Sequence, residues 1–362
     1  MKKLTVNKED LRHNINKIKS YTKEISGNDS YTIIGIVKGN GYGLDLLQYS
    51  KFLIDNGIEY LAVATLDEAL ILSKEKICNN ILMLSVLNDK EELEEAVKNN
   101  IIITIDSKEN AQAVNELAEK GYNIRAHIKI DTGFGRYGFI YNDYENIVQA
   151  IKSLHENVKV EGIFSHLSIA YYKNNKHTLE QFARFKKVIE IIEENGIDIK
   201  LKHICNSPAI LNYPEMHLTA ARIGSAFIGR VSSQNNIGLK KIGKLEISIA
   251  EVKQVPKDFN ISYLNVYKTK KETKIGIIPI GYEEGYNVTQ QIDMFRTIDK
   301  IRRAVHEIKN LLRKQKITVE IEGKRYDVIG TIRNVPYNSK SRRKYGENRW
   351  YSQARCKTSI YF

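Results

Sequence analysis

Cysteine and long apolar runs are both scarce in this chain. The 362-residue sequence contains only three cysteines, and no two of them form a Cys-x-x-Cys pair. Scattered thiols of this kind argue against a disulfide framework and give no zinc-binding spacing. No apolar run reaches the roughly 18 residues of a membrane span. The first residues, MKKLTVNKEDLRHN, open with two lysines and then turn polar, unlike a secretory signal. We therefore expect a cytoplasmic protein without a membrane segment or a metal site.

Low-complexity sequence is also absent as a dominant feature. Hydrophobic residues make up 42% of the chain and charged residues 27%. This balance excludes disorder, collagen and coiled coil for most of the sequence. At about 150 residues per domain, the length predicts two domains.

The net charge of +13 raises the question of nucleic-acid binding, but its distribution argues against it. Residues 332–362 hold eight Lys and Arg residues against one Glu, so this tail carries +7 and the rest of the chain only +6. Because the body is only mildly basic, we expect no nucleic-acid partner.

The strongest pattern in the first 230 residues is an alternation of short apolar runs with helical segments. Helical spacing is clearest at 109–121 and 179–196. Alternation of this kind predicts a parallel sheet, and eight runs favour a closed (β/α)8 barrel. The competing open sheet lacks the GxGxxG loop that a Rossmann domain needs after its first strand. The eight runs are 33–38, 60–65, 80–84, 101–105, 124–130, 160–167, 201–206 and 219–223.

After residue 230 the pattern changes to strands without intervening helices. We expect strands at 245–255, 275–281 and 317–330, the last with a hairpin turn at Glu322-Gly323-Lys324. A long helical pattern spans 293–315. The predicted organisation is therefore a barrel domain at 1–230, a β-rich domain at 231–331 and an atypical basic tail at 332–362.

Barrel enzymes place their chemistry at the carboxyl ends of the strands, so the residues there are the first candidates. Lys38 ends the first strand, where loss of hydration lowers the pKa of an amine and suits it to form a Schiff base. The glycines at 39, 41 and 43 permit a tight turn and close approach of a ligand. Most lysines at strand ends are simply solvated, so Lys38 alone decides nothing.

Two further strand ends carry candidate residues. With a period of two, Lys129 can point into the barrel, and Arg136 follows a Gly-Phe-Gly turn where its guanidinium could hold a carboxylate. His166 ends the sixth strand and could stack on a planar ring or exchange a proton. The structural alternatives are a salt-bridged surface arginine and a hydrogen-bonded core histidine.

The last two strand ends suit a phosphate. Asn206 and Ser207 could begin a helix, whose hydroxyl and free N–H groups would bind an anion. Arg222 ends the eighth strand, and Gly224 and Ser225 follow it. Phosphate binding at these two loops recurs in barrel folds.

In order and spacing, these features resemble the alanine racemase family of pyridoxal-phosphate enzymes. The lysine motif VKGNGYG and the segment KIDTGFGRYG are its most specific elements. The resemblance covers residues 1 to about 330 and also rests on five looser segments. These are FSHLSIA (164–170), CNSPAIL (205–211), ARIGSAFIG (221–229), ISYLNVY (261–267) and IGIIPIGYEEGY (275–286).

The resemblance implies a role for each candidate residue. Lys38 would hold pyridoxal 5'-phosphate covalently, and Arg222 would face its pyridine nitrogen. His166 would lie along the ring. Lys129, as a carbamate, would orient Arg136 towards the substrate. The phosphate would be held by Asn206, Ser207, Gly224 and Ser225, with Tyr42 nearby.

Racemisation needs proton exchange on both faces of the α-carbon. The resemblance assigns Lys38 to one face and Tyr263, supplied by the partner of a head-to-tail homodimer, to the other. A phenol with a pKa of about 10 needs help to act near neutrality, and His203 with Arg222 could supply it.

The resemblance weakens after Gly330. There GTIRNVP places Asn334 where the family has a methionine that borders the substrate pocket. The long 293–315 segment is similar to the cytosolic half of serine/alanine racemases of vancomycin-resistance systems. We expect a racemase for alanine, with serine second. Three alternatives stay open: a racemase or decarboxylase for a larger amino acid, a pyridoxal-phosphate carrier without turnover, and a racemase impaired by its tail.

Overall fold

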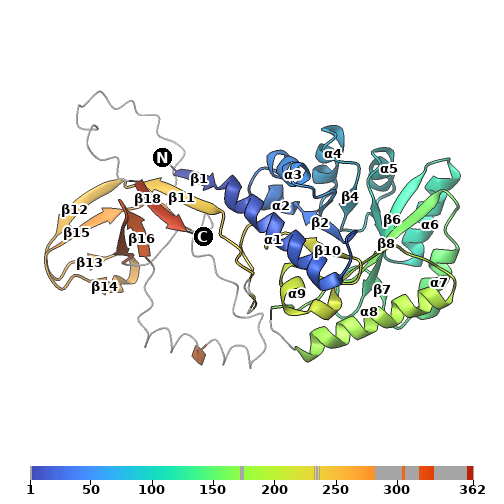
Figure 1. Ribbon diagram of the computed structural model, residues 1–362. Helices are drawn as coiled ribbons and strands as arrows, with labels where there is room; N and C mark the ends of the chain where they lie inside the picture. Colours follow the sequence, from blue (N-terminus) through green and yellow to red (C-terminus); the bar gives the residue numbers. More distant parts are fainter. Residues whose placement is uncertain are drawn as a thin grey trace. The chain divides into compact units, whose positions relative to one another are not determined.

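The computed structural model describes residues 2–171, 175–231, 233, 235, 237–281, 304–305, 318–329 and 357–361. The chain forms two compact units (Figure 1). One unit is Lys8–Ile242. The other combines Met1–Asn7 with Gly243–Phe362. No helix in the described ranges is long and apolar enough to cross a membrane.

Eight parallel strands of the Lys8–Ile242 unit close into the predicted barrel. Hydrogen bonding arranges them in two arcs, β10-β2-β3-β4 and β5-β6-β8-β9. A parallel bridge between Leu82 and Ile102 joins one seam, and the N–H of Arg222 donates to the carbonyl of Cys205 (3.0 Å) across the other. The strands are β2 (Thr32–Ile36), β3 (Tyr60–Val63), β4 (Ile81–Met83), β5 (Ile103–Ile105), β6 (Ile124–Asp131), β8 (Val158–Phe164), β9 (Leu201–His203) and β10 (Ala220–Ile223).

Several helices of this unit begin at a side chain that caps them. Ser107 and Asn175, for example, accept the backbone N–H groups of Asn110 and Thr178. These caps start the predicted helices slightly earlier than their apolar patterns suggest. The helices are α1 (Lys8–Ser26), α2 (Lys38–Tyr42), α3 (Leu46–Asp55), α4 (Leu66–Lys74), α5 (Lys90–Lys98), α6 (Lys108–Glu119), α7 (Tyr144–Lys152), α8 (Lys176–Glu194) and α9 (Ser207–Asn212), with the 3-10 helix η1 (Pro214–Met216).

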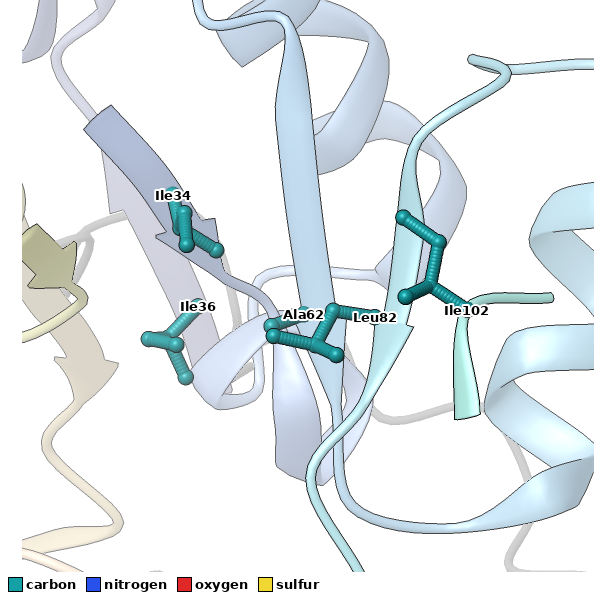
Figure 2. Packing of buried hydrophobic residues seen from close by; sticks show 5 residues of the cluster. All are labelled: Ile34, Ile36, Ala62, Leu82 and Ile102. Carbon is teal, nitrogen blue, oxygen red and sulfur yellow. The ribbon is translucent and has the colours of Figure 1, made fainter. Parts of the chain in front are cut away.

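The inner surface of the barrel is apolar on one side and polar on the other. A Cβ on Gly35 would lie 3.1 Å from Leu53 of α3, so the odd positions of β2 face the helices and the even ones face inward. Figure 2 shows the inward apolar cluster of Ile34, Ile36, Ala62, Leu82 and Ile102.

The polar side of the interior follows from the strand register. Arg222 pairs in register with Ile34, and His127 pairs with Thr104, which is two residues beyond Ile102. Residues paired across parallel strands share a face of the sheet. Arg222, His127, Lys129 and His203 therefore point into the barrel, which places the ionisable groups on β6, β9 and β10.

The second unit consists of antiparallel strands. Its main sheet has the order β1-β11-β18-β16-β17 and buries Leu245, Ile247 and Val319. The predicted hairpin is present, because Glu322 and Gly323 both have positive φ between β16 and β17. The strands are β1 (Lys2–Val6), β11 (Gly243–Ser248), β12 (Glu251–Val255), β13 (Asn260–Ile261), β14 (Tyr267–Lys268), β15 (Thr273–Ile277), β16 (Thr318–Ile321), β17 (Lys324–Asp327) and β18 (Lys357–Tyr361).

The two units differ from the expected domain limits in several places. Residues Lys2–Val6 pair antiparallel with β11 and so belong to the β-rich unit, and the division falls after Ile242 rather than residue 230. The expected single strand at 245–255 is two strands, β11 and β12. Most of 293–315 and of the 332–362 tail lies outside the described residues, but β18 in that tail pairs with β11 and β16.

We predict that Gly162→Ala destabilises the barrel. A Cβ at this position would lie 2.5 Å from Cε1 of the His127 ring, which is too close for two carbon atoms. We expect the free energy of unfolding to fall by about 1–3 kcal/mol, measured by urea denaturation. Gly276→Ala is the control, because its Cβ would meet Ile249 at an ordinary 3.5 Å. Equal stability of the two variants would contradict the prediction.

Candidate active site

Lys38 follows β2 at the start of a left-handed turn. Residues 39–43 of this turn all have positive φ, including the two non-glycine residues Asn40 and Tyr42. Such a run is strained for residues with a Cβ, and the glycines between them relieve it. The side chain of Asn40 also accepts the N–H of Leu46 (2.9 Å), which closes the turn. The turn presents Lys38 and Tyr42 at the carboxyl end of the barrel.

The surroundings of Lys38 favour the neutral amine. Burial lowers its pKa, and the nearby cations Arg136 and Arg222 lower it further, against an opposing effect of Glu68. A lysine with a lowered pKa is a better nucleophile near neutral pH.

Arg222 is a buried cation whose two Nη atoms both donate to fixed acceptors. One Nη donates to Nδ1 of His203 (2.7 Å) and to the carbonyl of the same residue (3.0 Å). The other Nη donates to the carbonyls of Ser165 (2.7 Å) and Ile204 (3.3 Å) and to Nδ1 of His166 (3.2 Å). Burial lowers the pKa of Arg222 to about 10, so the guanidinium stays charged at neutral pH.

The partners of Arg222 fix the tautomers of the neighbouring histidines. A guanidinium only donates, so Nδ1 of His203 must accept and its proton lies on Nε2. That Nε2 then donates to Nδ1 of His127 (3.1 Å). Burial lowers the pKa of both rings, and the Arg222 cation lowers that of His203 further, so both are neutral. The chain Arg222–His203–His127 therefore runs in one direction, away from the cation.

Lys129 is buried on the same polar side of the barrel. Only 4% of the residue is exposed, and its Nζ donates to the carbonyl of Ile130 (2.8 Å). Burial and then the Arg222 cation lower its pKa to about 7. Its surroundings thus favour the uncharged amine.

The loop after β6 is wrapped around one carboxylate. Asp131 accepts backbone N–H groups from the four residues of 133–136, at 2.8 to 3.3 Å. This arrangement directs Phe134 and Arg136 to the barrel mouth, where the guanidinium lies 4.5 Å from the Phe134 ring centre. Phe134 also contacts the ring of His166 edge-on, with ring centres 5.0 Å apart.

The candidate phosphate residues form one compact wall. The hydroxyl oxygen of Ser207 accepts the N–H groups of Gly224 (3.1 Å) and Ala226 (3.2 Å), and Asn206 caps α9 through the N–H of Ala209. A Cβ on Gly224 would overlap the hydroxyl of Tyr42, so only glycine fits beneath that ring. Tyr42, Ser207 and Gly224 thus meet as the sequence predicted, and the half-buried Ser225 follows Gly224.

One sequence-predicted residue belongs to the other unit, and one is not among the described residues. Tyr263 belongs to the β-rich unit, where 63% of it is exposed beside Ser262 and Leu264, both with positive φ. Asn334 lies outside the described residues. The structure brings together the candidates that belong to the barrel unit, namely Lys38, Tyr42, Lys129, Arg136, His166, Asn206, Ser207, Arg222, Gly224 and Ser225.

Known protein families account for both units of the chain. The model of the alanine racemase N-terminal domain matches residues 6–231, and that of the C-terminal domain matches residues 242–333. The chain belongs to the alanine racemase family. Enzymes of this family depend on pyridoxal phosphate.

Individual alanine racemases resemble the chain over most of its length. That of Methanococcus maripaludis is 36% identical over 76% of this chain and 74% of its own, and that of Clostridium tetani is 38% identical over 77% and 72%. The solved structure of the Clostridium difficile alanine racemase matches with a TM-score of 0.75 at 29% identity, over 92% of this chain and 81% of its own. The Bacillus anthracis alanine racemase with bound L-Ala-P matches with a TM-score of 0.74 at 25% identity, over 99% and 85%.

His127 is a feature of this alanine racemase site that the sequence analysis missed. It precedes Lys129 by two residues on an apolar strand, so the same period-two argument would have directed it inward. Its Nε2 has no hydrogen-bond partner among the described residues.

We predict that Lys129 makes the free energy of unfolding of the barrel depend on pH. Its folded pKa of about 7 lies below the usual value of about 10.4, so between these values the unfolded chain binds a proton that the folded chain does not. Stability should therefore rise from pH 7 to pH 10 by up to about 1.4 kcal/mol per pH unit.

The measurement compares wild type with Lys129→Met by urea denaturation in CO2-free buffer, because a carbamate would not titrate as an amine. The stability difference between the two proteins isolates Lys129 from groups that they share. A difference that stays constant from pH 7 to pH 10 would disprove the assignment.

Proposed function

We propose that this chain interconverts L- and D-alanine with pyridoxal 5'-phosphate as cofactor. The observation that carries the proposal is the buried cation Arg222, held beside the His166 ring in a barrel of the alanine racemase family. The Arg222 guanidinium keeps its own proton at neutral pH. This suits a site in which the proton removed from the substrate returns to the α-carbon.

The residues present fit a phosphate-bearing cofactor. The oxygen of Ser207 already accepts two N–H groups, so its own proton remains to be donated to an anion. Gly224 leaves room for Tyr42 where any side chain would collide. The hydroxyls of Ser207 and Tyr42 both lie against Gly224, and hydroxyl donors are groups that a phosphate can accept from.

Lys38 would be the covalent anchor of the cofactor. Asn206, Ser207, Gly224, Ser225 and Tyr42 would hold the phosphate. His166 would lie along the ring and Arg222 would donate to the pyridine nitrogen. When bound, pyridoxal phosphate draws electrons from the α-carbon of an amino acid and makes its proton removable.

Two bases on opposite faces would carry the proton. Lys38, whose pKa is lowered, would hold it on one face. Tyr263 would act on the other from the partner subunit of a homodimer, which fits its exposure on the β-rich unit. Arg136 would bind the substrate carboxylate, and Lys129 would orient Arg136 once carbamylated, a reaction that needs the neutral amine which burial favours.

The alternatives have less support. A pyridoxal-phosphate carrier of the single-domain type lacks a second domain, whereas this chain matches the C-terminal domain of the family. A larger substrate or a decarboxylation has no observation in its favour. A cytoplasmic location, a substrate preference for alanine over serine, and the homodimer are parts of the proposal.

We predict that Lys38 is modified by the cofactor and that Lys38 and Tyr263 are both needed for turnover. Borohydride reduction followed by peptide mapping should label Lys38. Lys38→Ala should lose both directions of racemisation, and Tyr263→Phe should lose most turnover while keeping the cofactor absorbance. A label on Lys129, or wild-type rates in Tyr263→Phe, would refute the two-base scheme.

A mixing experiment tests the shared site. If Tyr263 serves the partner's Lys38, mixed dimers of Lys38→Ala and Tyr263→Phe contain one intact site and should regain up to about a quarter to half of the wild-type rate, depending on the fraction of mixed dimers. Tyr326→Phe, an exposed tyrosine of the same unit, is the control for nonspecific effects. No recovery with mixed dimers demonstrated would exclude sharing.

We predict that Asn334 raises the preference for serine. An amide in place of the family's methionine could hydrogen-bond the serine hydroxyl, a net gain of roughly 0.5–1.5 kcal/mol or up to about tenfold in relative rate. Asn334→Met should therefore lower the serine-to-alanine ratio of kcat/KM. An unchanged ratio would place Asn334 away from the substrate.

A further inference from the structure

A single buried amide on α8 joins two of the loops that carry the site. Gln181 is 0% exposed, and its Nε2 donates to the carbonyl of His166 (3.1 Å) and to Oγ1 of Thr132 (3.3 Å). Its Oε1 accepts the N–H (3.0 Å) and the hydroxyl (3.1 Å) of Ser168. Both hydrogens and both lone pairs of the amide are therefore used.

The atoms that Gln181 binds belong to the carboxyl ends of β6 and β8. Thr132 opens the loop that presents Arg136, and its hydroxyl also hydrogen-bonds that of Ser165 (2.8 Å). His166 and Ser168 lie just beyond β8, which ends at Phe164. In the described part of the chain, the hydrogen bonds recorded for the backbones of His166 and Ser168 go to Gln181.

This placement matters because Arg222 depends on the same segment. One of its Nη atoms donates to the carbonyl of Ser165 and to Nδ1 of His166. Ser165 still donates its N–H to the carbonyl of His203 in β9 (3.2 Å), but no such pairing holds His166 and Ser168 in the described part of the chain. Gln181 replaces that pairing with side-chain bonds from the helix layer.

We propose that Gln181 is a positioning residue that holds His166 in place as an acceptor for Arg222. The inference rests on the proposed function for its catalytic meaning, because Arg222 acts on the cofactor ring there. The geometric part of the inference, that Gln181 fixes the His166 ring beside Arg222, does not depend on that function.

The experiment uses two variants of the full chain with bound cofactor. Gln181→Met keeps the length of the side chain and removes all four hydrogen bonds. Gln181→Glu keeps the oxygen that accepts from Ser168 but puts a second oxygen against the carbonyl of His166. It therefore removes the hydrogen bond to that carbonyl. If Gln181→Met fails to fold, Gln181→Glu and Ser168→Ala carry the test.

The first readout is the titration of His166, followed by NMR of histidine-labelled protein. Burial and the cations facing this ring keep its pKa well below the usual value. The groups that lower it when they carry a charge are Arg222, Arg136, Lys129 and Lys38. In Gln181→Met and Gln181→Glu the ring should move away from Arg222 and its pKa should rise towards about 6.5.

The second readout is the bound cofactor and its turnover. The absorbance of the holoenzyme should shift in both variants, because Arg222 loses an acceptor that orients it. We expect kcat to fall by about tenfold with a change in KM of less than about threefold. Ser168→Ala keeps the bond to His166 and should show a smaller effect.

Asn110→Leu is the matched control. Asn110 is also a buried amide on a helix of the barrel, but it donates to the carbonyl of Leu87 (3.1 Å) and has no recorded contact with the site. It should lose stability and leave the His166 titration and the cofactor absorbance unchanged. The same spectral change in Asn110→Leu as in Gln181→Met would overturn the proposal, as would an unaltered His166 titration in both Gln181 variants.

The two readouts distinguish a failure of the positioning role of Gln181 from a failure of the proposed function. The His166 titration can be followed in the same chain stripped of cofactor. If it responds to Gln181→Glu while wild type does not racemise alanine, the proposed function is wrong and the positioning of His166 by Gln181 holds. If wild type racemises alanine and His166 does not respond, the positioning role is wrong.

Discussion

The buried guanidinium of Arg222 is the interaction on which the rest of the site depends. An ionised group deep in a protein is costly unless hydrogen bonds replace its hydration. None of the partners that the structure describes for Arg222 is a carboxylate: three are backbone carbonyls and two are neutral imidazoles. The charge is thus solvated by dipoles and remains uncompensated. Its field reaches Lys38, Lys129, His166 and His203, and lowers the pKa of each.

The fold supplies those dipoles by leaving one side of the barrel interior polar. The apolar cluster around Ile34 and Leu82 fills the opposite side and gives the barrel a dry core. Gly162 adds space beside His127, and Gly224 adds space beneath Tyr42, so two glycines on the polar side create room that ordinary residues would fill. The strand order therefore places the charged groups on one side of the barrel interior, and the two glycines leave the space that the rings of His127 and Tyr42 occupy there.

Much of this could be predicted from the sequence because it depends on short-range patterns. Strand–helix alternation gave the eight barrel strands, and the strand ends gave Lys38, Arg136, His166 and Arg222. The β1 strand was assigned to the wrong unit, since its pairing with β11 joins segments more than 230 residues apart. Gln181 looks like any polar residue of an amphipathic helix, and only the packing of α8 shows that it is completely buried. The orientation of the histidine chain also required knowledge of which nitrogens face Arg222.

Among the described residues Arg222 has no carboxylate partner, and this bears directly on the outcome of the proposed reaction. A carboxylate at the ring nitrogen of pyridoxal phosphate would keep that nitrogen protonated and let the ring take up negative charge. A guanidinium with a pKa of about 10 offers only a hydrogen bond, because it does not transfer its proton at neutral pH. With Arg222 at the ring nitrogen, as proposed, the ring would take up less negative charge, which would favour return of the proton to the α-carbon. The two neutral imidazoles reinforce this, since Nδ1 of each accepts from Arg222 and thereby keeps the cation oriented without neutralising it. In the proposed reaction, the same hydrogen bonds that make the charge tolerable in the barrel would thus favour racemisation over transamination.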